Sequence, residues 1–324
     1  MEEPELTIGI ATYNGERFLE AVLESIMLEA RGKPIEVLIS DNASTDRTAE
    51  IARSFQSRYP GQVRHYRNAS NIEFDGNVDN VVRQAKGRFV WTMADDDFLL
   101  PGAADKVLSV IRSEPDLAII FANFTNPITL KAKENALCQD GNAFFRTVQF
   151  KNGLLSCNIF NRSVWLDLDM KRYDGCLWIH MAYAMEALAP KLGRKGYVFT
   201  DLLIRQDGVA RWGHGGKFIY TGLRLVEVFQ KMRELGYDKD VCRMGARVIE
   251  GGYKESIPRA KANGLEVDSA LLRRMFPLYR QLPSFWIWDV PMLLLPNSFF
   301  RIGFQAGRRI KYGCPDNEGA KSSG

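Results

Sequence analysis

Strand-like and helix-like patterns alternate through the first third of this 324-residue chain, and this order constrains the fold more than any other feature. Short runs rich in β-branched residues predict strands at 6–12, 35–40, 63–67, 88–94 and 117–123. Between them, apolar residues recur at helical spacing, as in segments 18–27 and 75–86. Strands that alternate with helices predict an α/β fold with a mostly parallel, doubly wound sheet and helices on both faces.

Polar residues follow three of the expected strands, at the point where each strand ends. The three clusters are Thr12-Tyr13-Asn14, Asp41-Asn42 and Asp95-Asp96-Asp97. Ligands of doubly wound sheets bind at the carboxyl ends of the strands, next to the switch in strand order. We therefore expect the three clusters to form one ligand site, in which the carboxylate of Asp41 can accept the imide N–H of uracil or thymine.

The aspartate triplet 95–97 predicts a divalent metal ion, because adjacent carboxylates repel one another unless a cation is bound. Mg²⁺ or Mn²⁺ takes one or two protein carboxylates and completes its coordination with water and phosphate oxygens. The triplet is thus suited to a metal that bridges to a diphosphate. The alternative is a solvated loop that caps the helix expected from Pro101.

Several classes of function lack their sequence signals. No strand is followed by G-x-G-x-x-G or by G-K-[ST], which disfavours dinucleotide oxidoreductases and P-loop enzymes. The net charge of +4 is too small to indicate a nucleic-acid partner. Five cysteines without a C-x-x-C pair indicate neither a disulfide framework nor a zinc site. We therefore expect reduced thiols and a cytoplasmic protein, without a signal peptide or a membrane-spanning segment.

Three blocks of the chain resemble the successive signatures of glycosyltransferase family 2, the inverting enzymes of the GT-A fold. They are LTIGIATYNGERFLEAVLESI, VLISDNASTDRTAEIA and NIEFDGNVDNVVRQAKGRFVWTMADDDFLLPGA, which together cover roughly residues 6–110. The form DDDFLLP, with the later segments CNIFNRSVW and GCLWIHMAYAMEALA, is similar to bacterial O-antigen and surface-polysaccharide sugar transferases. The resemblance implies a metal-dependent, inverting transfer of a sugar from a nucleotide diphosphate donor to a saccharide acceptor, which is expected to be lipid-linked.

The resemblance also implies roles for individual residues at the strand ends. Residues expected to bind the donor are Thr12, Tyr13, Asn14, Asp41, Asn77, Asp95 and Asp96. Thr12, Tyr13 and Asp41 would hold the base and ribose. Asp97 would complete the DxD motif and coordinate the metal together with Asp95. For Asn77, a plain helix-capping role is the alternative.

The general base of an inverting transfer must lie within hydrogen-bond reach of the acceptor hydroxyl, opposite the leaving group. Many relatives place it in a Glu-Asp pair, which the corresponding segment YDGCLWIHMAYAMEA lacks. Asp174 and His180 are the two candidates, and the sequence leaves the choice open. His180 matches the expected helix start and has a suitable ordinary pKa, whereas Asp174 has the carboxylate chemistry. The alternative for His180 is a buried structural histidine.

The rest of the chain is expected to form three parts after a GT-A domain at 1–205. The basic loop RQDGVARWGHGGK, at 205–217, is expected to close over the diphosphate, with Arg211 or His214 contacting the phosphates or the metal; a plain surface loop is the alternative. The region 206–312 is otherwise predicted to be helical, and the tail 313–324 to be disordered.

The segment 273–312 combines seven Lys or Arg residues and many aromatic residues with a single acid, Asp289. This composition is typical of segments that bind the anionic inner leaflet of a membrane. We therefore expect a peripheral location at the inner face of the cytoplasmic membrane. The alternative is a helix pair that packs on the catalytic domain or forms a dimer contact; the sequence carries no signal for the oligomeric state.

Two other functions are compatible with the same fold class. A nucleotidyltransferase would carry a glycine-rich loop with activating basic residues after the first strand, where this chain has Tyr13-Asn14-Gly15-Glu16. A non-catalytic binding or scaffold protein has no need of three consecutive aspartates. Both remain alternatives to a glycosyltransferase, and the sequence does not identify the donor sugar or base.

Overall fold

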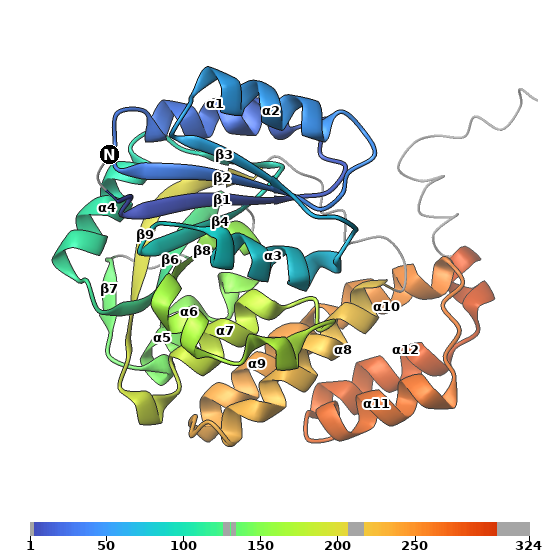
Figure 1. Ribbon diagram of the computed structural model, residues 1–324. Coiled ribbons are helices and arrows are strands. Elements are labelled where there is room, and N and C mark those ends of the chain that lie inside the picture. Colours follow the sequence, from blue (N-terminus) through green and yellow to red (C-terminus); the bar gives the residue numbers. More distant parts are fainter. Residues whose placement is uncertain (1–2, 126–129, 131–133, 207–216, 303–324) are drawn as a thin grey trace, which may run out of the picture. The chain divides into compact units, whose positions relative to one another are not determined.

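The structure is a computed structural model that describes residues 3–125, 130, 134–206 and 217–302 (Figure 1). The chain forms two compact units. The first combines Met1–Val209 with Arg224–Gly245, and the second combines Ala210–Leu223 with Ala246–Gly324. The tail 313–324, for which disorder is predicted, lies outside the described residues.

The first unit contains one sheet, to which nine strands of the described residues contribute in the order β3-β2-β1-β4-β8-β6-β9-β5, with β7 paired to β9. The strands are β1 (Leu6–Thr12), β2 (Ile35–Asp41), β3 (Val63–Arg67), β4 (Phe89–Ala94), β5 (Asp97–Leu99), β6 (Leu117–Thr125), β7 (Ala136–Cys138), β8 (Asn158–Asn161) and β9 (Lys195–Gln206). Strands β3, β2, β1 and β4 run parallel, and β8 lies antiparallel between β4 and β6. The predicted α/β class with a mostly parallel sheet is confirmed.

Helices cover both faces of this sheet, as the sequence predicts. They are α1 (Leu19–Ala30), α2 (Thr48–Arg58), α3 (Glu73–Gln84), α4 (Ala103–Ser113), α5 (Gly141–Val148), α6 (Arg162–Asp167) and α7 (Ile179–Ala187). Figure 1 shows α1 and α2 on one side of strands β1 to β3 and α3 on the other. Val22 and Ile26 of α1 and Val78 and Val81 of α3 are fully buried, because their helical spacing gathers them on the face that packs on the sheet.

The chain around the aspartate triplet differs from the sequence expectation in one respect. Asp97–Leu99 forms the short strand β5, antiparallel to β9, and α4 begins only at Ala103. The carboxylate of Glu29 accepts hydrogen bonds from the backbone N–H groups of Gly102 and Ala104, both at 3.0 Å. It is therefore Glu29 of α1, and not the aspartate triplet, that caps α4.

The C-terminal region is mainly helical, as predicted. Its helices are α8 (Lys217–Gln230), α9 (Lys239–Gly251), α10 (Tyr253–Ala262), α11 (Ser269–Tyr279), a π-helix (Phe285–Asp289) and α12 (Val290–Leu294). Short 3₁₀ turns occur at Lys151–Gly153, Leu155–Cys157, Met170–Tyr173, Pro190–Leu192 and Lys231–Arg233. Within the described residues, no helix has the length and apolar character that crossing a membrane requires.

Residues 224–245 group with the first unit, although they follow the sequence boundary placed at 205. The ring of Phe229 packs against that of Phe150 with their centroids 4.9 Å apart. The hydroxyl of Tyr237 donates to the carbonyl of Met185 at 2.8 Å. Arg146 forms ion pairs with Asp238 and Asp240. These contacts join residues 146–185 to residues 229–240. Local composition, from which the boundary at 205 is drawn, carries no information about contacts between such distant segments.

Candidate active site

The first four parallel strands end at the same edge of the sheet. Thr12 lies opposite Asp41 in the pairing of β1 with β2, and Asp41 lies opposite Arg67 in the pairing of β2 with β3. On the other side of β1, Ala11 lies opposite Ala94, the residue that precedes the aspartate triplet. The three polar clusters expected from the sequence therefore meet at one edge, where doubly wound sheets bind ligands.

Direct contacts join the first loop to the triplet. The hydroxyl of Thr12 donates to Asp95 Oδ2 at 2.6 Å, and both side chains are buried. A Cβ atom at Gly15 would collide with this carboxylate and with the Thr12 hydroxyl. Only glycine therefore lets the backbone after β1 approach the aspartates this closely.

The loops after β1 and β2 hold one another through reciprocal hydrogen bonds. The N–H of Asn14 donates to Ser44 Oγ at 2.9 Å, while Asn14 Oδ1 accepts from the N–H of Thr45 at 2.8 Å. The N–H of Gly15 donates to Thr48 Oγ1 at 2.8 Å. Asn14 and Ala43 both have positive φ angles, of 53° and 60°. Left-handed backbone at non-glycine residues persists only where neighbours hold it, and it is concentrated at functional sites.

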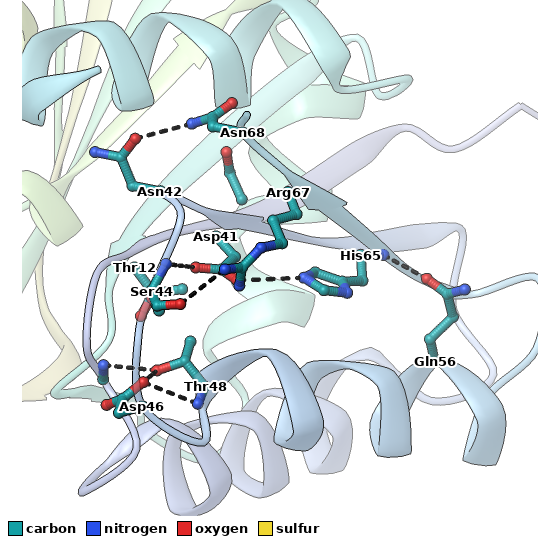
Figure 2. A network of polar contacts seen from close by, with 12 residues as sticks. Thr12, Asp41, Asn42, Ser44, Asp46, Thr48, Gln56, His65, Arg67 and Asn68 are labelled. Carbon is teal, nitrogen blue, oxygen red and sulfur yellow. Dashed lines mark hydrogen bonds and ion pairs between the residues drawn. The ribbon is translucent and has the colours of Figure 1, made fainter. Parts of the chain in front are cut away.

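Asp41 is fully buried and paired with Arg67, as Figure 2 shows. Arg67 Nη1 lies 2.5 Å from Asp41 Oδ2, and the N–H of Ser44 donates to Oδ1 at 2.8 Å. His65 Nε2 lies 3.9 Å from Oδ2. Burial alone would raise the pKa of Asp41, but these groups outweigh it and hold the pKa well below its usual range. Asp41 is thus ionised, and Arg67, whose side chain is 39% exposed, is the accessible member of the pair.

A network of asparagines fixes the chain between β3 and α3. Asn77 Oδ1 accepts from Ser40 Oγ at 2.7 Å and from Asn68 Nδ2 at 3.2 Å. Asn68 also donates to Asn42 Oδ1 at 3.0 Å (Figure 2). Asn77 lies in the second turn of α3 and not at its cap, so its side chain connects this helix to the end of β2.

Ser156 holds the last aspartate of the triplet. Its hydroxyl donates to Asp97 Oδ2 at 2.5 Å and accepts from the N–H of Ala94 at 2.9 Å. Because the N–H of Ala94 can only donate, the hydroxyl hydrogen must point to Asp97. Asp97 is buried, whereas Asp96 is half-buried.

The aspartate triplet supplies fewer protein ligands than a metal site made by the protein alone would need. Among the described residues, no three His, Cys, Asp or Glu side chains are grouped so that they could hold a metal ion. Asp95 and Asp97 offer two carboxylates at the turn between β4 and β5. Hard oxygen donors of this number suit Mg²⁺ or Mn²⁺ when a diphosphate and water supply the other ligands.

The two candidate bases occupy different surroundings on the same segment. His180 of α7 is buried, and its Nε2 lies 2.9 Å from the carbonyl oxygen of Gly153. A carbonyl can only accept, so Nε2 carries a hydrogen and Nδ1, also buried, is the basic atom. Burial lowers the pKa of His180 to about 4. Asp174 lies in the loop before α7 and is exposed.

The expected phosphate-contacting residues Arg211 and His214 lie outside the described residues. Arg205, at the start of the same basic loop, is described, and its guanidinium lies 4.6 Å from the ring centroid of Phe98. Phe98 is part of β5, directly after Asp97. The strand that leads into the loop is therefore next to the aspartate triplet.

Sequence reasoning did not select three residues that organise this edge. Arg67 is the last residue of an expected strand, and it is brought to Asp41 by the pairing of β2 with β3. Ser156 lies 59 residues from its partner Asp97. Gly15 lies in the first family-like block, but its role follows only from its closeness to Asp95. For two of these residues the sequence contains a signal. Gly15 lies within a family-like block, and Ser156 directly precedes another one.

Comparison with known proteins identifies relatives of this chain. Residues 7–164 match the family model described as glycosyl transferase family 2. A Campylobacter jejuni protein, GalNAc(5)-diNAcBac-PP-undecaprenol beta-1,3-glucosyltransferase, is 24% identical over 255 residues, or 73% of this chain and 78% of that protein.

Two solved structures resemble this chain over nearly its whole length. S. aureus TarS 1-349 in complex with UDP aligns with a TM-score of 0.61 at 14% identity, over 97% of this chain and 94% of that one. The mannosyltransferase PcManGT from Pyrobaculum calidifontis, in complex with GDP-Man and Mn²⁺, aligns with a TM-score of 0.57 at 15% identity, over 97% and 89%. At these identities the structural likeness establishes the GT-A fold. Taken with the family match and the sequence relative, it follows that the chain is a glycosyltransferase whose residues 7–164 match the family 2 model.

Proposed function

We propose that this glycosyltransferase is a metal-dependent, inverting enzyme that transfers a sugar from a nucleoside diphosphate to a saccharide acceptor. The observation that carries the proposal is the meeting of Thr12, the Asp41–Arg67 pair and the aspartate triplet at one edge of the sheet. This edge offers an ionised pair for a base, hydroxyl and amide groups for a ribose, and carboxylates for a metal-bound diphosphate.

The donor binds across the loops after β1, β2 and β4. Tyr13, whose side chain is 44% exposed, is available to contact the base, and Asp41 with Arg67 lies at the neighbouring strand end. Thr12, Asn14 and Asn77 hold these loops in place through the hydrogen bonds described above. Asp96 faces the ribose and diphosphate side in this proposal, and Arg211 or His214 of the basic loop contacts the phosphates.

Asp97 and Asp95 hold the divalent metal ion in this proposal. When bound, the ion offsets negative charge that develops on the departing nucleoside diphosphate. Ser156 keeps the Asp97 carboxylate oriented through its hydroxyl, and Thr12 does the same for Asp95. Residues that orient a ligand in this way commonly affect metal affinity by about 10- to 100-fold.

In this proposal Asp174 is the general base, and the exposure of its side chain supports that role. The acceptor hydroxyl attacks the anomeric carbon from the face opposite the diphosphate, its oxygen forms the new glycosidic bond, and the bond from the anomeric carbon to the phosphate oxygen breaks. Asp174 takes the proton that the hydroxyl loses. His180 is the weaker candidate because its ring is buried and its Nε2 hydrogen is directed to the Gly153 carbonyl.

The acceptor in this proposal is a lipid-linked saccharide of surface-polysaccharide synthesis, reached at the inner face of the cytoplasmic membrane. The name of the Campylobacter relative includes an undecaprenol-linked saccharide, which supports this class of acceptor. Within 269–302 of the second unit, Trp286, Ile287 and Trp288 are exposed. The charged residues of this range are four arginines and Asp289, which is fully buried. A basic, aromatic surface of this kind suits anionic lipid.

The test is a thermal-shift screen of nucleoside diphosphates with and without Mn²⁺, combined with an assay of donor hydrolysis. A ligand that binds only the folded state raises the melting temperature. We expect a shift with a diphosphate that increases with Mn²⁺, and we expect Asp97→Asn to remove the metal-dependent part and the turnover. Asp201→Asn, at an exposed ion pair with Lys106, is the control. Metal-dependent turnover that survives in Asp97→Asn would contradict the proposal.

A further inference from the structure

The loop 174–178, which carries Asp174 into α7, has a constrained backbone. Gly175 and Leu177 have φ angles of +77° and +66°. For leucine this conformation is rare, and it persists only where surrounding contacts determine it. The residue before α7, Trp178, makes no side-chain hydrogen bond to cap the helix. The loop therefore needs a partner from elsewhere in the chain.

Asp75 of α3 is that partner. Its Oδ2 accepts from the N–H of Leu177 at 2.6 Å, and its Oδ1 accepts from the N–H of Ile179 at 3.2 Å. Asp75 is buried, and burial raises its pKa although the two N–H groups oppose this. A carboxylate at the first turn of a helix also interacts favourably with the helix dipole. One side chain thus fixes both the strained residue and the start of α7.

A second contact holds the other side of the loop. Arg224 Nη1 donates to the carbonyl of Gly175 at 2.6 Å. Asp174, whose side chain is exposed, directly precedes Gly175. The backbone that carries Asp174 is therefore held by two side chains, Asp75 and Arg224. On α3, Asn77 follows Asp75 by two residues and bonds to Ser40 at the end of β2. The first two turns of α3 therefore contact the loop of the proposed base and the strand edge of the proposed donor site.

We propose that Asp75 is a positioning residue that sets the Asp174 carboxylate against the acceptor hydroxyl through the loop 174–178. This inference rests on the proposed function, in which Asp174 is the base. Misplacing a catalytic group by about 1 Å lowers rates by as much as about 100-fold. In this proposal Asp75 acts through the loop alone, by its hydrogen bonds to the backbone of Leu177 and Ile179 and to the side chain of Cys176.

The test is Asp75→Asn, which keeps the size of the side chain but replaces one acceptor oxygen by a donor. We expect kcat for sugar transfer to fall by about 10- to 100-fold while the KM for the donor changes less than about twofold. Hydrogen exchange should quicken at least about tenfold at one of the two amides, that of Leu177 or that of Ile179, because the Asn side chain keeps an acceptor oxygen for only one of these N–H groups. Donor-induced thermal shifts, retained in the variant, would show that the protein is folded.

The matched control is Asp79→Asn, one turn further along α3. Asp79 accepts from Trp165 Nε1 at 2.8 Å and pairs with Arg83, so its loss lowers stability without changing the loop 174–178. We expect its kcat to stay within about twofold of the parent. An Asp75→Asn variant with unchanged kcat, or with unchanged exchange at the two amides, overturns the inference. Failure of the proposed function gives a different result. Asp174→Asn would then retain transfer, while Asp75→Asn would still quicken exchange at the amide that loses its acceptor.

Discussion

At the residue scale, the site is built from charged and polar side chains that are buried and almost completely partnered. Asp41 has no exposed surface, yet Arg67, Ser44 and His65 surround its carboxylate. Burying a charge is costly unless it is paired and hydrogen-bonded. These side chains therefore contribute to folding as well as to the chemistry of the site, and their removal has consequences for stability that can be measured.

Asp41 should make the stability of the protein depend on pH in the acid range. Its pKa is depressed in the folded state, so its stabilisation is present above the unfolded value of roughly 3.9 and is lost as the pH falls towards the folded value. Asp41→Asn should cost about 1–3 kcal/mol at pH 7, because Arg67 and the N–H of Ser44 lose a charged acceptor. It should also reduce the loss of stability between pH 5 and pH 3.

Urea unfolding of the parent and of the variant across this pH range provides the measurement. Asp201→Asn is the control, because its ion pair with Lys106 is about half exposed and should contribute less than about 1 kcal/mol. Equal slopes of stability against pH for Asp41→Asn and the parent would show that Asp41 does not have a depressed pKa.

At the element scale, two helices that lead away from the site are capped by carboxylates from distant helices. Glu29 of α1 caps α4, which follows the aspartate triplet, and Asp75 of α3 caps α7, which follows the loop of Asp174. The residues at the N-caps of α4 and α7, Gly102 and Trp178, provide no side-chain cap of their own. Helix starts near the site are thus fixed by the tertiary structure and not by the local sequence.

Glu29→Ala should destabilise the protein by about 1–2 kcal/mol, because the N–H groups of Gly102 and Ala104 lose their acceptor. Glu24→Ala on the same helix is a matched control, since Glu24 is half exposed and pairs with Arg58. Its effect should stay below about 1 kcal/mol. Denaturant unfolding measures both values, and equal losses for the two variants would argue against a capping role for Glu29.

At the scale of the whole molecule, the chain divides into a unit with the sheet and a helical unit with an unusual surface. In the helical unit, Lys261 and Asp289 are buried, while large apolar side chains are exposed. The exposed large apolar residues of 269–302 are Phe276, Trp286, Ile287, Trp288, Leu294, Leu295, Phe299 and Ile302. Exposed apolar side chains in this number, together with the four arginines of the same range, are typical of an interaction surface.

The full chain should float with vesicles that contain anionic lipid and should remain behind with neutral vesicles. Replacing Trp286 and Trp288 together by alanine should weaken this binding at least about tenfold, because interfacial affinity scales with buried apolar area. Leu28→Ala is the matched control, since Leu28 is an exposed apolar residue on α1 of the other unit. Flotation that is the same for the tryptophan variant and the parent would contradict a membrane-binding surface at these residues.

The sequence by itself determined the α/β class, the order of the first strands and the meeting of Thr12, Asp41 and the aspartate triplet at one edge. Hydrophobic periodicity predicts which segments form strands and helices. Once the strands are parallel, their carboxyl ends lie at the same edge of the sheet. Only the tertiary structure decided which groups the charged residues meet. Arg67 reaches Asp41 through strand register, Glu29 and Asp75 reach helices more than 70 residues away, and packing buries His180 while Asp174 stays exposed. Such contacts depend on how separate elements pack, which spacing along the chain does not encode.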